Sequence, residues 1–244
     1  MKVAIMQPYL FPYIGYFSLI KNTNHFVFFD TPQYIRKGWI NRNRILGTNG
    51  KDVYFTVPVE KCSRETSIKN VKISYNENWE EKWMGQLTFY KKRAPYYSAV
   101  VQLVQDVMNS NTQYISELAI NSVVKTCQYL GINIVYDVYS QMNLSAFEVG
   151  APDEWALYIT KEMKYDTYVN PPGGKSFFDA GKYQKENIEL EFLTQEIQEY
   201  NQRVKEFVPA LSILDVMMFC TPKEIVDMMD SYKIERKGNI NGGK

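Results

Sequence analysis

MKVAIMQPYLFPYIGYFSLIKNTNHFVFFD, residues 1–30, contains two apolar runs with the length of buried strands, Val3–Met6 and Phe26–Phe29. Between them, Gly15–Ile20 is apolar over a length that suits a helix. Two parallel strands joined by a helical crossover are the simplest arrangement of these segments. The loop Gln7–Tyr16 then follows a strand and opens a helix, where backbone N–H groups can meet a phosphate or carboxylate. We therefore take this loop as the functional one.

The rest of the chain continues the α/β pattern. Residues 38–58 predict a β-hairpin, because Asn49 and Gly50 supply the backbone conformation that tight turns need. Residues 77–130 carry three helical periods. We expect an α/β protein with a mostly parallel, Rossmann-like sheet, a β-hairpin and a helical segment packed beside it. A single domain is expected over residues 1–236, and a disordered tail over residues 237–244.

Composition excludes several classes of protein. The chain has 244 residues and a formal charge of +1, so no global field attracts nucleic acid or anionic lipid. It has no 18-residue apolar run and no signal-peptide pattern, which makes the cytoplasm the expected location. Three widely spaced cysteines without a CxxC pair argue against a disulfide framework and a structural zinc site. Composition leaves the oligomeric state open.

One short stretch concentrates positive charge. Arg36, Lys37, Arg42 and Arg44 lie within nine residues, and the period of two expected for a strand sends the last two to the same side. Guanidinium groups bind phosphate or carboxylate in a bidentate manner, so we predict an anionic small-molecule ligand here. The alternative is a solvated basic strand, or a structural pairing with Asp30 and Glu60. From the same stretch we add two candidate binding residues, Trp39 and Asn41.

A second glycine-bearing loop follows the strand expected at Thr167–Asn170. It reads PPGGKSFFD, and Gly173 and Gly174 would let the backbone approach a ligand closely. The spacing is not that of a P-loop, because Val169 stands where the earlier glycine is required. Two loops of this kind after strands suggest that they share one cleft.

The single histidine, His25, restricts the chemistry. It lies at the start of an expected strand and in no nucleophile-bearing motif, which argues against a Ser-His-Asp or Cys-His hydrolase and a histidine-ligated metal. Any general base is then a carboxylate, a tyrosine or the substrate's own amine. No paired Asp motif indicates a metal site, so we predict none, and metal catalysis through carboxylates alone stays open.

The chain resembles the WbqC-like family, whose members begin with a Gln-Pro-aromatic-x-x-Pro-x-x-Gly-Tyr-Phe signature. The resemblance continues through RKGWINRNRI, TVPVE, LGINI, the segment 168–179 and VPALSILD. It implies a role in bacterial surface-polysaccharide (O-antigen) biosynthesis, because the family is associated with such gene clusters and glycyl transfer onto amino sugars has been suggested for some members. The residues that carry the signature here are Gln7, Pro8, Tyr9, Pro12, Gly15, Tyr16 and Phe17.

Our preferred hypothesis is a transferase that adds a glycyl or aminoacyl group to a nucleotide-linked amino sugar. In this hypothesis the diphosphate is held by Arg36, Arg42 and Arg44. Tyr13 and Tyr16 stack on the base or the sugar. Gln7 and Asp30 orient the amine or the acyl donor. The sequence does not choose among ATP, a thioester and a charged tRNA as the source of the activated acyl group, and no cofactor is certain.

Two alternatives remain open. Tyr13-Ile14-Gly15-Tyr16 resembles a degenerate H-x-G-H signature, which would make the protein a nucleotidylyltransferase. A non-catalytic nucleotide-sugar-binding protein is the other alternative, because few obvious acid or base residues are present.

Overall fold

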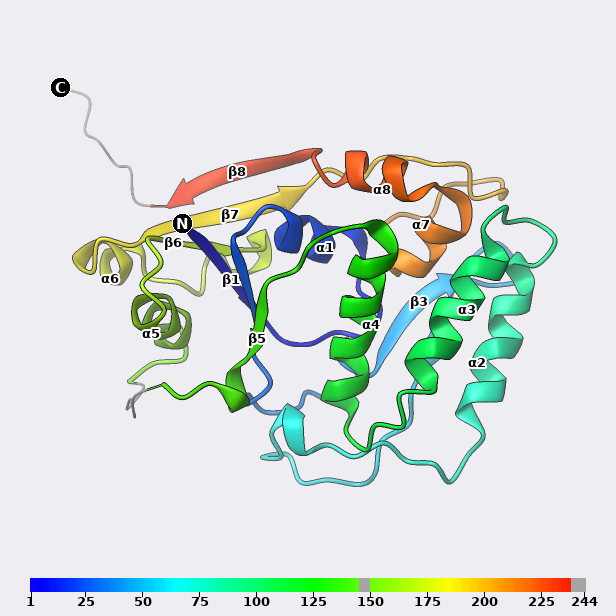
Figure 1. The fold of residues 1–244 in the computed structure, drawn as a ribbon, viewed down its shortest axis with the longest axis horizontal. Coiled ribbons are helices and arrows are strands. Elements are labelled where there is room, and N and C mark those ends of the chain that lie inside the picture. The colour runs from blue at the N-terminus through cyan, green and yellow to red at the C-terminus, as the bar shows by residue number, and fades with distance from the viewer. Residues whose placement is uncertain (145–149, 238–244) are drawn as a thin grey trace.

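A computed structural model of the protein describes residues 1–144 and 150–237. Its largest sheet has six strands in the spatial order β5-β2-β1-β6-β7-β8 (Figure 1). All neighbouring strands are parallel except β7 and β8, which are antiparallel. The strands are β1 (Lys2–Met6), β2 (His25–Phe28), β5 (Tyr136–Val138), β6 (Thr167–Asn170), β7 (Glu189–Gln195) and β8 (Tyr232–Lys237).

The strand order contains a topological switch point between β1 and β6. The chain leaves β1 through α1 (Ile14–Lys21) to its neighbour β2, and later passes from β5 through α5 (Glu154–Glu162) to β6 on the other side of β1. This is the order of a doubly wound sheet, in which ligands bind beyond the carboxyl ends of the strands at the switch point. The predicted Rossmann-like, mostly parallel sheet is confirmed.

Alternating residues of β1 separate two hydrophobic cores. Ala4 faces a core shared with α1, the hairpin and most other helices, whereas Val3 and Ile5 face a smaller core formed with α5 and α6. The sheet is therefore covered on both faces, as its parallel strands require. The remaining helices of the carboxyl-terminal half are α6 (Ala180–Lys185), α7 (Ile213–Phe219) and α8 (Pro222–Met228).

The predicted hairpin and helical segment are both present beside the sheet (Figure 1). The hairpin consists of β3 (Arg42–Leu46) and β4 (Asp52–Thr56), and Gly50 in its turn has a φ of 73°. The helical segment ends at Gly131, whose φ of 70° gives the left-handed conformation typical of a helix end. Its helices are α2 (Trp79–Leu87), α3 (Tyr97–Met108) and α4 (Ile115–Leu130). The described residues also form short 3₁₀ helices, which are η1 (Ile68–Asn70), η2 (Thr88–Tyr90), η3 (Tyr139–Gln141) and η4 (Pro172–Gly174).

The carboxyl-terminal end differs from the expectation. Lys237, which we assigned to a disordered tail, is the last residue of β8 and pairs with Leu190 of β7. The strand contains Lys233, Ile234, Glu235 and Arg236, a polar pattern that suits an exposed edge strand. Residues 238–244 lie outside the described residues.

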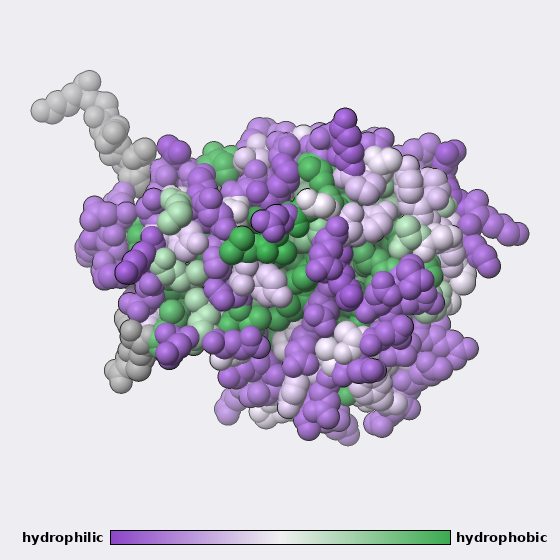
Figure 2. Space-filling model, viewed as in Figure 1, coloured by the Kyte–Doolittle hydropathy of each residue, from purple (hydrophilic) through white to green (hydrophobic). Residues whose placement is uncertain are grey.

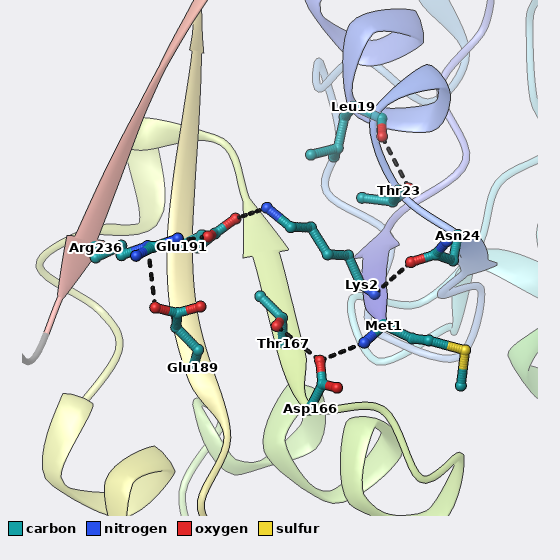
Figure 3. A network of polar contacts seen from close by, with 10 residues as sticks. All are labelled: Met1, Lys2, Leu19, Thr23, Asn24, Asp166, Thr167, Glu189, Glu191 and Arg236. Atoms are coloured by element: carbon teal, nitrogen blue, oxygen red, sulfur yellow. Dashed lines mark hydrogen bonds and ion pairs between the residues drawn. The ribbon is translucent and has the colours of Figure 1, made fainter.

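Ionic contacts join strands at the amino-terminal edge of the sheet. Lys2 of β1 extends across β6 to the buried carboxylate of Glu191 in β7, which also accepts a hydrogen bond of 3.2 Å from Arg236 of β8 (Figure 3). Asp166 binds the amino terminus at the same edge. These contacts lie toward the end of the sheet at which β1 and β6 begin, opposite to the end with the switch-point loops.

None of the helices in the described part of the chain combines the length and the apolar character needed to cross a bilayer. In Figure 2, hydrophilic side chains cover the rim of the viewed face, and hydrophobic side chains show near its centre.

Candidate functional site

Two adjoining cavities open at the carboxyl ends of β1 and β6, and both are lined by Met6 and Tyr9. The first, which we call the tyrosine lobe, has a volume of about 310 Å³, and the second, the aromatic lobe, about 780 Å³. The tyrosine lobe is lined by Met6, Tyr9, Tyr13, Tyr16, Trp39, Asn43, Arg44, Pro171 and Ala210. The aromatic lobe is lined by Ile5, Met6, Gln7, Tyr9, Phe29, Thr31, Pro32, Gln33, Tyr139, Pro152, Trp155, Ala156, Tyr168, Asn170, Phe177 and Phe178.

The two lobes lie where the switch point predicts a ligand. Met6 is the last residue of β1, Asn170 is the last residue of β6, and Gln7 and Pro171 begin the loops that follow. The expected sharing of one cleft by the loops after these two strands is therefore what the structure shows.

Arg44 is the positively charged residue of the tyrosine lobe. Its Nη1 donates to Asp52 at 3.1 Å, and its Nη2 donates to the Ala210 carbonyl at 3.4 Å. The guanidinium carbon lies 5.7 Å from the centre of the Trp39 ring. Its Nε is buried and has no hydrogen-bond partner among the described residues. A guanidinium group beside an aromatic ring suits a ligand in which an anionic group is linked to a planar ring.

Three tyrosines of the first loop contribute ring faces to the tyrosine lobe, and Tyr9 and Tyr13 also contribute hydroxyl donors. Burial raises the pKa of Tyr9 and Tyr13, and raises that of Tyr16 well above its ordinary value. Their hydroxyls therefore stay protonated at neutral pH and do not serve as general bases. The Tyr16 hydroxyl donates to the Gln7 carbonyl at 2.9 Å, which ties the beginning of the loop to α1.

Buried polar side chains from distant elements fix the backbone of this loop. Phe11 is fully buried and has a φ of 40°, a conformation that residues other than glycine rarely adopt. Its N–H donates to Ser122 Oγ of α4 at 2.9 Å. Its carbonyl accepts from Asn43 Nδ2 at 2.8 Å and from Ser212 Oγ at 2.7 Å. The loop is thus preorganised before any ligand binds.

The aromatic lobe has three rings that lock one another in place. Phe29 lies 5.0 Å from Tyr139 and 5.8 Å from Trp155, and these last two rings are 5.7 Å apart. Asp30 supports this arrangement, because its carboxylate accepts from the backbone N–H and the hydroxyl of Ser140, next to Tyr139. Asp30 is 3% exposed and does not line either lobe. We predicted it as a catalytic residue; the structure places its carboxylate against Ser140, next to Tyr139 and outside both lobes.

The other predicted cations are not in the tyrosine lobe. Arg36 donates to the Cys62 carbonyl, and Arg42 donates to the carbonyls of Lys37 and Gly38 while lying over the Tyr54 ring. Lys37 is exposed and adopts a left-handed conformation with a φ of 60°. Of the four cations that we grouped, the structure brings Arg44 alone to the cleft.

Asn41 is also a structural residue rather than a cleft residue. It is buried, its Oδ1 accepts from the Tyr34 hydroxyl at 2.9 Å, and its Nδ2 donates to the Val57 carbonyl at 2.8 Å. Its neighbour Trp39 is 40% exposed and lines the tyrosine lobe as expected.

The predicted glycines shape the walls without lining them. A side chain at Gly15 would meet the Tyr13 ring at 2.5 Å, and one at Gly174 would meet Asn170 Nδ2 at 2.4 Å. Both glycines therefore make room for residues that do line the lobes. At Gly173 a side chain would meet nothing within 4 Å, and this glycine has no evident role at the site.

Acid and base groups are scarce at the cleft. Neither lobe is lined by a histidine or a carboxylate among residues 1–144 and 150–237. In the same ranges no three His, Cys, Asp or Glu side chains are grouped so as to hold a metal ion. His25 contacts Asp137 at the start of β2, which is the opposite edge of the sheet.

Sequence reasoning missed most of the aromatic lobe. Trp155 lies in α5 and Phe177 lies in the second loop, and no local pattern joins them to Phe29 or Tyr139. One available signal was the pair Phe177 and Phe178 within that glycine-bearing loop. Asn43 was noted as part of the strand alternation, but its role in holding Phe11 depends on a contact across more than thirty residues.

Comparison with known proteins gives one family. A family model described as the WbqC-like protein family matches residues 7–227, a range that includes all the residues lining the two lobes except Ile5 and Met6. A Mycobacterium tuberculosis protein described as "Uncharacterized protein Rv1507c" is 26% identical over 223 residues, which cover 88% of this chain and 92% of that protein. No solved structure gives a significant match.

Proposed function

Because the chain belongs to the WbqC-like protein family, we propose that it is a transferase of bacterial surface-polysaccharide (O-antigen) biosynthesis. The reaction is the transfer of an aminoacyl group, glycyl in the simplest case, to the amine of a nucleotide-linked amino sugar. Its place is the cytoplasm, where activated sugars and acyl donors occur together.

The observation that carries this proposal is the division of the cleft into two unlike lobes. The tyrosine lobe contains Arg44 and Trp39, which suit a diphosphate and the ring of a nucleoside. The adjoining aromatic lobe contains rings and amide groups and suits a second, different part of the same ligand. A nucleotide-linked sugar has two such parts joined by a short link.

The chemistry requires little of the protein beyond positioning. The amine nitrogen attacks the carbonyl carbon of an activated aminoacyl donor, and a C–N bond forms. The bond between that carbon and the leaving group breaks with its electron pair, and the proton lost by nitrogen goes to the leaving group. An aminoacyl adenylate made from ATP, a thioester and an aminoacyl ester of tRNA are all donors of this class. Holding amine and donor together supplies much of the rate.

The residues of the first loop contribute hydrogen-bond donors to this step. Tyr9 and Tyr13 line the tyrosine lobe with protonated hydroxyls, which can donate to phosphate oxygens or to the developing oxyanion. The Gln7 side chain lines the aromatic lobe and has no hydrogen-bond partner among the described residues. It is therefore available to orient the sugar or the amine.

A second candidate function is a non-catalytic nucleotide-sugar-binding protein. One observation favours it: within the described residues, neither lobe has a carboxylate or a histidine to act as a general base. The nucleotidylyltransferase alternative has less support. The H-x-G-H signature would need Tyr16 to contact phosphate, and Tyr16 is 2% exposed with its hydroxyl proton directed to the Gln7 carbonyl.

The test begins with binding. Arg44→Ala is expected to weaken binding of nucleotide sugars by about 10- to 100-fold, since a hydrogen bond to a charged group contributes about 1.5–3 kcal/mol. Arg36→Ala is the matched control, because Arg36 is exposed and lies outside both lobes. Titration calorimetry measures both. If wild-type protein binds no nucleotide sugar, the proposed function is wrong.

The test of catalysis uses nucleotide-linked amino sugars with glycine and ATP, glycyl thioester or glycyl-tRNA. The expected product is the sugar nucleotide with the added mass of one glycyl residue, detected by mass spectrometry. Tight binding with no product from any of the donors would instead support the binding-protein function.

A further inference from the structure

We propose that the aromatic lobe receives the sugar ring as an electrically neutral group, while the tyrosine lobe takes the nucleoside diphosphate. The inference rests on the proposed function and deepens it, because it assigns each part of the substrate to one lobe. It also assigns a chemical state to the sugar: hydroxylated or N-acylated, or an amino sugar with its amine in the free-base form.

The two lobes differ in the charge of their walls. Among the residues that the structure describes, no Asp, Glu, Lys, Arg or His lines the aromatic lobe. A carboxylate or an ammonium group placed there would lose its water without gaining a counter-ion, which costs several kcal/mol. The tyrosine lobe differs because it contains Arg44. The diphosphate is thus directed to one side of the switch point.

The surface of the aromatic lobe consists mainly of aromatic rings, with amide groups beside them. Phe29, Tyr139 and Trp155 are fixed by their mutual contacts, and Phe177 at the rim is 52% exposed. Rings of this kind suit the apolar C–H face of a pyranose. The Gln7 amide lies in this wall without a hydrogen-bond partner among the described residues and offers a donor and an acceptor to hydroxyl or acylamino groups, whereas the Asn170 amide is held by the Tyr168 hydroxyl and the Pro171 carbonyl. A volume of about 780 Å³ is within the range of small-molecule sites.

The uncharged environment of the aromatic lobe explains how an amine could react without a general base among the lining residues. Moving an ammonium group from water into an uncharged pocket lowers its pKa and favours the neutral amine. The neutral amine is the nucleophile of acyl transfer, and the amide product is neutral too. The lobe therefore prepares the amine by desolvation, so that a protein carboxylate is not needed for that purpose.

The assignment of the lobes is tested with two variants and two kinds of ligand. The ligands are uridine, thymidine and guanosine diphosphates and their hexose or N-acetylhexosamine conjugates, and calorimetry measures their affinities. Phe177→Ala is expected to weaken the sugar conjugates about 3- to 10-fold and leave the free diphosphates unchanged. Arg44→Ala should weaken both. Tyr75→Ala is the control, because Tyr75 is 56% exposed and lies outside both lobes.

These outcomes separate the inference from the proposed function. If Arg44→Ala weakens both ligands while Phe177→Ala weakens neither or both equally, the lobe assignment is overturned and nucleotide-sugar binding at the cleft survives. If no diphosphate or conjugate binds wild-type protein, the proposed function fails and takes the inference with it.

The neutral state of the sugar has its own test. A nucleotide-linked uronic acid should bind at least about 10-fold more weakly than the matching neutral hexose conjugate, because its carboxylate has no partner in the lobe. For a conjugate with a free amine, affinity should rise with pH through the pKa of the ammonium group, whereas the N-acetylated conjugate should show no such rise. Tighter binding of the ammonium form than of the neutral amine would mean that the rings hold a cation, and tighter binding of the uronic acid conjugate would mean that a cationic group reaches its carboxylate; either result would overturn the inference.

Discussion

Gly15 controls the position of the ring that covers it. It lies in the first turn of α1, and a side chain there would meet the far end of the Tyr13 ring at 2.5 Å. That ring is held only by packing, so it can rotate away instead of unfolding the helix. A change of one methyl group therefore alters the wall of the tyrosine lobe.

We expect Gly15→Ala to separate stability from binding. Alanine is favoured over glycine in a helix by about 0.5–1 kcal/mol, so thermal unfolding should be unchanged or slightly higher. Affinity for a nucleoside diphosphate should fall, because the Tyr13 ring is displaced. Gly85→Ala in α2 is the control, since a side chain there would meet nothing within 4 Å. In a Tyr13→Ala background, a further loss of affinity on adding Gly15→Ala would contradict this explanation.

At the scale of elements, the first loop depends on side chains that approach from three directions. Ser122 of α4, Asn43 of β3 and Ser212 at the start of α7 all bind the backbone of Phe11. The helical segment and the hairpin therefore support the site. No residue of α4 lines either lobe, yet α4 helps to fix the loop that does. This explains how helices far from the switch point contribute to it.

Ser122→Ala is expected to cost about 1–3 kcal/mol of unfolding free energy, because the buried Phe11 N–H loses its acceptor. Ligand affinity should fall as well, since the loop no longer starts in its binding conformation. Ser110→Ala is the control, because that hydroxyl bonds the Val107 carbonyl at the end of α3, away from the cleft. Denaturant titration and calorimetry measure the two effects. Equal losses in both variants would contradict the proposed role of Ser122.

The sequence supports the elements better than the contacts between them. The strands and helix of residues 1–30 follow from apolar periodicity, and the hairpin follows from its Asn-Gly turn, because both signals are local. The cluster Arg36, Lys37, Arg42 and Arg44 is equally local, yet only Arg44 reaches the cleft. Arg36 and Arg42 bond to backbone carbonyls, and Arg42 also lies over the Tyr54 ring, whereas Lys37 is exposed; these placements depend on how the hairpin packs.

The aromatic lobe could not be predicted for the same physical reason. Phe29, Tyr139, Trp155 and Phe177 come from four segments that meet only when β5, β2, β1 and β6 lie side by side in the sheet. Asn41 shows the reverse case. Its residue type and place suggested binding, but Tyr34 and Val57 use both atoms of its amide in the core.

For the whole molecule, the contacts of Glu191 join β1, β7 and β8 (Figure 3). Its side chain is fully buried, so it needs a cation. Lys2→Ala and Arg236→Ala should each lower the unfolding free energy only slightly, because Glu191 keeps one cationic partner in each variant. The double variant should cost about 3–5 kcal/mol, more than the sum of the singles, by leaving a buried charge unpaired. Adding Glu191→Gln should restore much of that stability in denaturant titrations; no rescue would show that the cations act through packing alone.

A second buried carboxylate makes the stability of the molecule depend on pH. Asp215 of α7 accepts hydrogen bonds from Tyr90, from Tyr200 at 2.6 Å and from Gln202 at 2.9 Å, and thereby joins α7 to the 3₁₀ turn η2 and to the segment before α7. Burial raises the pKa of Asp215, while these hydrogen bonds act in the lowering direction. The carboxyl group therefore binds its proton more tightly in the folded protein than in the unfolded chain.

The sign of the pH effect follows from linkage. The contribution of Asp215 to stability is fully present below the pKa of the unfolded chain, about 3.9, and is lost as pH rises through the folded value. We expect the unfolding free energy of wild-type protein, measured relative to Asp215→Asn, to fall as pH rises through this window and then to level off. Asn has no titration of its own, and the other carboxylates act equally in both proteins. A relative stability that rises with pH would mean that the hydrogen bonds outweigh burial and lower the pKa of Asp215.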